Sequence, residues 1–412
     1  MAITEADIRG EVLEWFHGAW DPELPLLEWR ERLVDSGWAV PSWSPEWFGR
    51  GLPAWTDRTA HDAIRHAGGV AVPLGGGMGL AAPTMYDHAS DELKKKYLRQ
   101  TITGELTWCQ LFSEPGAGSD LAGLRATAVR DGDEWVVNGQ KVWNTMAHHA
   151  DMAILVARTD WDVVKHAGIT YFLLDMRQPG VEVRQILEMN YHDSFNEVFL
   201  DDARIPAEDV VGEVGDGWRV ARGTLAHERS FSMMREVYFS PDATGRVMEE
   251  ARAEAAEYNK TYEWYPQRKG RVDLVIERAR ATGAAADPVV RQEMMKLISF
   301  EQASAWTAAR AKAARELGRP PGSEGSIGKL ALSVIARQAN HVHSMIAGPT
   351  AMLRETDDPI DSVIAEILVS TPAQSIAGGT DEIQHNILGE NVLGLPKEPD
   401  PNKGKPFNEV GA

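Results

Sequence analysis

The spacing of apolar residues changes twice along the 412 residues of this chain. Ala6 to Phe16 and Leu26 to Asp35 carry apolar residues every three or four positions, which is typical of amphipathic helices. After about residue 105, short apolar runs separated by Gly, Pro and Asp replace this pattern, and the helical spacing returns after Gly217. The chain is therefore expected to be an α+β protein with a β domain between two helical domains.

Domain boundaries follow from these changes, because 412 residues exceed what one hydrophobic core usually holds. Short strands at such spacing favour a small β-barrel or sandwich over βαβ units, and long helices interrupted by Pro and Gly suit a bundle. The predicted parts are an N-terminal helical domain (1–106), a middle β domain (107–215), a C-terminal four-helix bundle (216–395) and a tail (396–412) on the surface or against a partner.

The strands of the middle domain are expected at three apolar runs, 152–157, 169–174 and 196–200. Asn138-Gly139 is the preferred pair for a tight hairpin turn, so it predicts a further hairpin between residues 134 and 143.

Composition excludes several classes of function. The net charge of -19 argues against nucleic acid, because neutralising phosphates needs a basic face. Cys109 is the only cysteine, so no intrachain disulfide can form. The sequence has no signal-peptide pattern and no stretch of 18 apolar residues, so we expect a cytoplasmic protein without a membrane span. Its histidines lack the spacing of a metal site.

The segment Cys109–Asp120, with the sequence CQLFSEPGAGSD, is the strongest local signal. Gly116 and Gly118 permit a tight turn whose backbone could approach a planar ligand or a phosphate. Ser113 and Ser119 add hydroxyl groups beside it. On these residues alone, a glycine turn that only links a helical domain to a β domain remains possible.

This segment resembles the signature of the acyl-CoA dehydrogenase family. Trp143-Asn144-Thr145 resembles the family's Trp-x-Thr motif, and Gly378–Gln384 resembles its C-terminal active-site motif. The likeness covers nearly the whole chain with the domain order intact. It implies FAD clamped between the middle and C-terminal domains, with part of the site supplied by a neighbouring subunit.

The resemblance also implies roles for individual residues. Trp143 would cover the flavin face and Thr145 would bond near flavin N5, although Trp143 could instead be a core tryptophan. Thr380 also fits a helix N-cap, which is compatible with a flavin contact. The implied FAD contacts are Gln110, Phe112, Ser113, Ser119, Trp143, Thr145, Arg280, Gln292, Thr380 and Glu382, with Ser119 and Arg229 also at the substrate.

The catalytic base is the point at which this chain departs from many relatives. Desaturating an acyl-CoA needs a carboxylate held in an apolar pocket, where desolvation raises a carboxylate's pKa toward the working pH. Many relatives carry it just before the Gly-Thr pair, where this chain has Gly378. Glu228 matches the base position of the isovaleryl- and long-chain-specific branches. The alternative for Glu228 is an exposed helix carboxylate.

The function implied by the resemblance is FAD-dependent α,β-desaturation of an acyl-CoA, with electrons passed to an electron-transferring flavoprotein. It also implies a homo-oligomer, a dimer or a tetramer. Two alternatives remain open: an oxidase that uses oxygen, and a non-catalytic subunit that completes a partner's site in a hetero-oligomer. Met345 and Pro349 favour the second, because they lack hydrogen-bond donors where the family supports the FAD adenosine end. The length, branching and ring content of the acyl group stay open.

Overall fold

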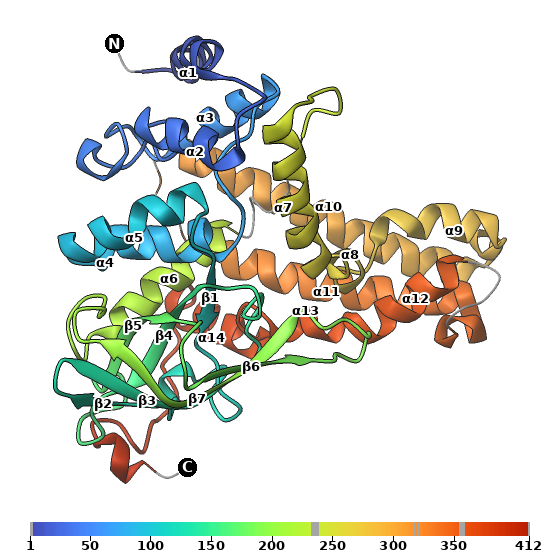
Figure 1. Cartoon of the computed structure of the whole chain (residues 1–412). Coiled ribbons are helices and arrows are strands. Elements are labelled where there is room, and N and C mark those ends of the chain that lie inside the picture. The colour runs from blue at the N-terminus through green and yellow to red at the C-terminus, as the bar shows by residue number, and fades with distance from the viewer. Residues whose placement is uncertain are drawn as a thin grey trace. The chain divides into compact units, whose positions relative to one another are not determined.

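The computed structural model describes residues 3–231, 239–316, 319, 322, 324–353 and 359–410. The chain forms two compact units (Figure 1). Unit 1 comprises Met1–Ile186, Asp193–Thr261 and Asn402–Ala412, and unit 2 comprises Leu187–His192 and Tyr262–Pro401. Helices, then a sheet, then helices follow one another along the chain, so the predicted α+β class is confirmed.

Two helices of unit 1 begin at residues whose side chains cap them. Thr4 and Asp7 form a reciprocal capping box at the start of the first helix, and Ser90 caps the fifth. Both predicted N-terminal helices are present. The helices are α1 (Glu5–Ala19), α2 (Leu26–Asp35), α3 (Trp55–His66), α4 (Ala82–His88), α5 (Asp91–Thr103), α6 (Gly217–Phe231) and α7 (Arg246–Thr261).

The β region forms one seven-stranded sheet in the order β1-β4-β2-β3-β7-β6, with β5 paired to β4. β1 runs parallel to β4, and the β4–β5, β2–β3, β3–β7 and β6–β7 pairs are antiparallel. All three predicted strands are present. The strands are β1 (Trp108–Leu111), β2 (Thr127–Asp131), β3 (Glu134–Lys141), β4 (Met152–Arg158), β5 (Ile169–Asp175), β6 (Val181–Ile186) and β7 (Phe195–Pro206).

The predicted hairpin turn at Asn138-Gly139 is wrong. These residues lie inside β3, at a bulge where the pairing with β7 shifts register. The Asn138 side chain donates to and accepts from Asp202 of β7, so the pair fastens two strands together. Gly139 is needed because a Cβ there would lie 2.6 Å from that of Ala126. The tight turn occurs earlier, at Gly132, between β2 and β3.

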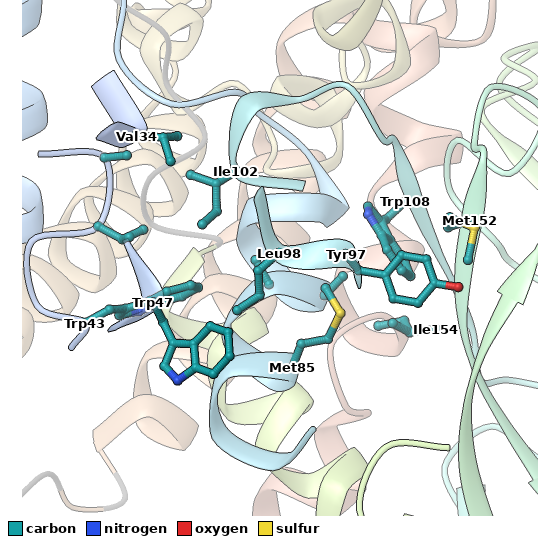
Figure 2. Close-up of a cluster of buried hydrophobic side chains, with 14 of the residues drawn as sticks. Val34, Trp43, Trp47, Met85, Tyr97, Leu98, Ile102, Trp108, Met152 and Ile154 are labelled. Atoms are coloured by element: carbon teal, nitrogen blue, oxygen red, sulfur yellow. The ribbon is translucent and has the colours of Figure 1, made fainter. Parts of the chain in front are cut away.

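Strand β4 is buried along its whole length because it faces two cores. Met152 and Ile154 point toward the helical side, and the alternate residues Ala153 and Leu155 point toward the opposite side. On the helical side the Tyr97 and Trp108 rings meet edge to face, with centroids 5.9 Å apart. Figure 2 shows these two rings beside Met152 and Ile154. The N-terminal helices and the sheet therefore share one core.

Unit 2 is helical. Its core lies between the two long helices, α10 (Pro288–Glu316) and α11 (Glu324–Ala347), and the shorter α9 (Val275–Ala281). The chain breaks at Gly283, which is left-handed, and the next helix begins at Pro288. Among the described helices none is long and apolar enough to cross a membrane. The helices are α8 (Tyr265–Arg268), α9 (Val275–Ala281), α10 (Pro288–Glu316), α11 (Glu324–Ala347), α12 (Pro359–Ser370), α13 (Pro372–Ile376) and α14 (Asp381–Asn391).

Candidate active site

The Ser113–Ser119 loop follows β1 in unit 1 and closes on itself. Glu114 and Ala117 exchange main-chain hydrogen bonds of 3.0 Å, which makes a tight turn. Gly116 and Gly118 face open space, and Ser119 is exposed. The loop borders a cavity of about 210 Å³. Its backbone is therefore accessible to a ligand, as the glycine pattern predicts.

A buried ion pair fixes this loop to the sheet. Lys141, at the end of β3, is completely buried and donates to Glu114 at 2.8 Å and to the Phe112 carbonyl at 3.1 Å. The Glu114 carboxylate also accepts from the main-chain N–H groups of Arg125 and Ala126, at 2.6 and 2.9 Å. Burial lowers the pKa of the Lys141 ammonium, and Glu114 offsets part of this effect.

Trp143 combines exposure with an unusual backbone. Its side chain is 58% exposed, and its φ of +63° is rare for a bulky residue. Asn144 and Asn196 hold this backbone: the Asn144 N–H donates to the Asn196 carbonyl, and the Asn196 amide donates to the Asn144 carbonyl. An exposed aromatic ring held in a strained turn fits a face that covers a planar ligand.

The other predicted flavin-side residues of unit 1 lie close to this turn. The Asn144 amide donates to the Gln110 carbonyl at 2.7 Å, and the Val142 N–H donates to the Ser113 carbonyl at 2.9 Å. Gln110 Nε2 is buried without a hydrogen-bond partner in the described part of the chain. Thr145 is partly buried.

Phe112 is placed differently from its neighbours in the loop. Its side chain is buried in the core and meets Tyr171 edge to face at 5.8 Å. Only its main chain is left to face a ligand.

Glu228 lies on α6, one helical turn beyond a buried cluster of hydroxyl groups. Thr224 bonds to Thr84 of α4 at 2.9 Å and to Tyr171 of β5 at 3.0 Å. Because residues four apart share a helix face, Glu228 continues the face on which Thr224 is buried, and it is itself partly buried. His227 pairs with Asp87 of α4 at 2.9 Å. The Arg229 side chain lies outside the described residues.

In unit 2 the predicted contacts surround a pair of left-handed glycines. Gly378 and Gly379 have φ of +69° and +86°, so the chain turns sharply into α14. Thr380 caps this helix, and its hydroxyl accepts from the Ile383 N–H at 3.3 Å. The turn leaves Glu382 exposed.

Asp381 anchors this turn to α11. Lys329, Arg337 and Ser333 donate to its carboxylate at 2.7–2.8 Å. Burial alone would raise the pKa of Asp381, but these hydrogen bonds outweigh burial and hold the pKa well below its usual range.

Gln292 and Arg280 are exposed on α10 and α9. Gln292 precedes Glu293, whose carboxylate accepts from Gln338 of α11 at 2.7 Å. Thr380 likewise precedes Asp381, which is bound to Arg337 of α11. Met345 packs against the core of unit 2 and Pro349 is exposed.

Three family models cover most of the chain. They describe the acyl-CoA dehydrogenase N-terminal domain over residues 2–105, the middle domain over 109–203 and the C-terminal domain over 269–393. The chain belongs to the acyl-CoA dehydrogenase family. Such proteins are flavoprotein oxidoreductases that act on CH–CH bonds, with FAD as the family cofactor.

Individual relatives of this chain agree with the family models. Acyl-CoA dehydrogenase IpdE1 of Mycobacterium tuberculosis is 34% identical, over 90% of this chain and 88% of its own length. FadE34 of the same organism is 37% identical over 91% of this chain, which spans only 47% of FadE34. The crystal structure of the ChsE4–ChsE5 complex, also from that organism, has a TM-score of 0.65 and 26% identity, over 97% of this chain and 100% of that chain.

The sequence motifs did not reveal the residues that anchor the Ser113–Ser119 loop and the Gly378-Gly379 turn. Lys141, Lys329 and Arg337 lie far in sequence from the carboxylates they bind. Only Lys141 gave an indirect signal, because it ends a strand whose other buried residues, Trp135 and Val137, are apolar. The described residues bring together no group of three His, Cys, Asp or Glu that could hold a metal ion.

Proposed function

We propose that the chain binds FAD non-covalently and desaturates an acyl-CoA thioester to a 2,3-enoyl-CoA, passing the electrons to an electron-transferring flavoprotein. The main support for this proposal is that a carboxylate is missing at position 378 and present at position 228. Gly378 has no side chain where many relatives keep the base, and Glu228 lies partly buried on α6.

The reaction needs a base for one proton. Glu228 would accept the proton from the carbon α to the thioester carbonyl, and a positioned base of this kind contributes roughly 10²–10⁴-fold in rate. Bound FAD supplies the acceptor for the hydride that leaves the β carbon. The Thr84–Thr224–Tyr171 hydroxyl cluster fixes the helix turn before Glu228, so the carboxylate is held on a rigid element.

Several residues of unit 1 suit an FAD site. The exposed Trp143 ring would cover the isoalloxazine, and the open Ser113–Ser119 loop would approach the cofactor with Ser119 also at the CoA arm. Cys109 is buried, and burial raises the pKa of its thiol to about 12, which argues against a cysteinyl flavin link. Gln110, Phe112, Thr145, Arg280, Gln292, Thr380 and Glu382 stay predicted contacts, and Arg229 a predicted substrate contact.

The second candidate function is that of a subunit in a hetero-oligomer of acyl-CoA dehydrogenase-like chains. Two observations favour it over a homo-oligomer. Met345 and Pro349 offer no side-chain donor at the predicted adenosine end, and a solved relative is a complex of two differently named proteins, ChsE4 and ChsE5. This chain would then be a non-catalytic subunit that completes a partner's site.

The test is an anaerobic titration of the purified, FAD-saturated chain with straight, branched and ring-bearing acyl-CoA thioesters. Bleaching of the flavin absorbance together with a product two hydrogens lighter supports the desaturation. Flavin binding only after a partner chain is added favours the hetero-oligomer. Peroxide formed in equal amount to enoyl-CoA in air points to an oxidase. No bleaching by any thioester, in the presence of bound flavin, contradicts the proposal.

A further inference from the structure

The last described segment of the chain, residues 402–410, returns to unit 1 (Figure 1) and is named here the C-terminal strap. It lies against the loop between β4 and β5. The Phe407 N–H donates to the Val163 carbonyl at 2.8 Å, and the Asn408 N–H donates to the Trp161 carbonyl at 2.9 Å. Phe407 is only 4% exposed, so part of the predicted surface tail is buried against its own chain.

The Phe407 ring lies near two guanidinium groups. The Arg158 guanidinium is 3.6 Å from the ring centroid, and that of Arg125 is 5.5 Å away. Arg158 is completely buried, and desolvation lowers its pKa to about 10. An aromatic face stabilises a cation most strongly when the cation is removed from water, so Phe407 is well placed to hold Arg158.

Arg158 in turn organises the chain just after the Ser113–Ser119 loop. Its guanidinium donates to the carbonyls of Ala122 at 2.7 Å and Leu124 at 3.1 Å, and to that of Lys165 at 3.0 Å. The Lys165 ammonium pairs with Asp120 at 2.8 Å.

Arg125 joins the same path to the loop. The main-chain N–H groups of Arg125 and Ala126 donate to the Glu114 carboxylate, which lies inside the loop itself. A continuous set of contacts therefore leads from Phe407, through both arginines, to the Ser113–Ser119 loop.

We propose that Phe407 is a positioning residue for the Ser113–Ser119 loop, and that the C-terminal strap thereby sets the affinity for the acyl-CoA thioester. This inference rests on the proposed function, in which Ser119 contacts the CoA arm. Phe407 touches neither α6 nor Glu228 in the described contacts, so its effect should fall on binding and spare the proton transfer.

The first measurement compares Phe407→Ala with the wild-type oligomer under steady-state conditions. We expect the KM for the best acyl-CoA to rise about 5- to 30-fold with kcat within about twofold. This range corresponds to a cation–aromatic contact of about 1–2 kcal/mol at about 1.4 kcal/mol per tenfold change. Phe407→Trp keeps an aromatic face and should restore the KM. Glu409→Gln, at an exposed neighbour on the strap, should leave it unchanged.

The second measurement is amide hydrogen exchange of the same proteins without substrate. Residues 113–126 should exchange faster in Phe407→Ala, while β6 and β7, which lie outside the set of contacts described above, should keep their protection. Unchanged exchange over 113–126 overturns the proposal, whatever the KM does. If no thioester reduces the wild-type flavin, the proposed function fails, and the exchange result still decides whether the strap orders the loop.

Discussion

Two glycine-containing turns carry predicted ligand contacts, one in each unit, and a buried carboxylate anchors each of them. Glu114 anchors the Ser113–Ser119 loop, and Asp381 anchors the Gly378-Gly379 turn. Both carboxylates lie 2.8 Å from a lysine, Lys141 for Glu114 and Lys329 for Asp381. Each turn leaves exposed one residue that is predicted to meet a ligand, Ser119 in unit 1 and Glu382 in unit 2.

The two anchors differ in how completely they exclude water. Lys141 is fully buried, and Glu114 is otherwise held by two main-chain N–H groups. Asp381 instead has a second cation, Arg337, whose side chain is 53% exposed. A buried charge that loses its partner is costly because no water replaces that partner. The loop in unit 1 therefore has a single cation opposite its carboxylate, whereas two cations share the carboxylate in the turn of unit 2.

The largest expected effect on stability comes from breaking the pair in unit 1. Lys141→Met leaves Glu114 buried without its cation, and we expect a loss of about 3–5 kcal/mol in the free energy of unfolding. Arg204→Met, which removes exposed pairs with Asp131 and Glu134 at the surface of the same sheet, should cost far less, because solvent screens both pairs. Chemical denaturation followed by fluorescence measures both. Equal effects of the two variants would contradict the comparison.

Asp381→Asn should lower the free energy of unfolding less than Lys141→Met does, by about 1–3 kcal/mol. The hydrogen-bond partners of Asp381 are partly solvated or keep other partners. The effect should depend on pH. The folded pKa of Asp381 is depressed below 3.8, so its contribution is fully present above the unfolded pKa and is lost as pH falls through the folded one. The stability difference between wild type and Asp381→Asn should therefore shrink below about pH 3.8. A difference that stays constant down to acid unfolding would rule out this role for Asp381.

The smallest stability effect is expected at an exposed ligand-facing residue. Trp143→Gly removes a side chain that is mostly in solvent and relieves a left-handed backbone, so the free energy of unfolding should change by no more than about 1 kcal/mol. FAD affinity should nevertheless fall, because the predicted cover of the flavin is gone. Calorimetry without cofactor and a fluorescence titration with FAD separate the two effects. A loss of stability above about 2 kcal/mol would mean that Trp143 is an anchor.

The sequence predicts the fold well where one pattern dominates a segment. The α2 helix and the buried strands β4 and β5 follow from apolar spacing alone. The hairpin prediction fails at Asn138-Gly139 because this pair serves a contact to Asp202, distant in sequence, and local turn preference cannot reveal such a contact.

The candidate site divides in the same way. Motif resemblance identifies exposed residues such as Ser119 and Trp143, because each of them lies within a short motif of consecutive residues. The anchors Lys141 and Arg337, and the strap residue Phe407, act on distant partners and show no local pattern. Side-chain pairing of this kind depends on the tertiary fold. Local patterns in a single sequence do not show which distant residues that fold brings together.

The most direct test of the account is the rate of anaerobic flavin reduction by a good acyl-CoA in Glu228→Gln. The change is nearly isosteric, so folding and FAD saturation should be retained, and Arg222→Gln on an exposed position of α6 serves as the matched control. We predict a rate roughly 10²–10⁴-fold below wild type for Glu228→Gln and a wild-type rate for the control. Reduction of the Glu228→Gln flavin at the wild-type rate would show that the base lies elsewhere.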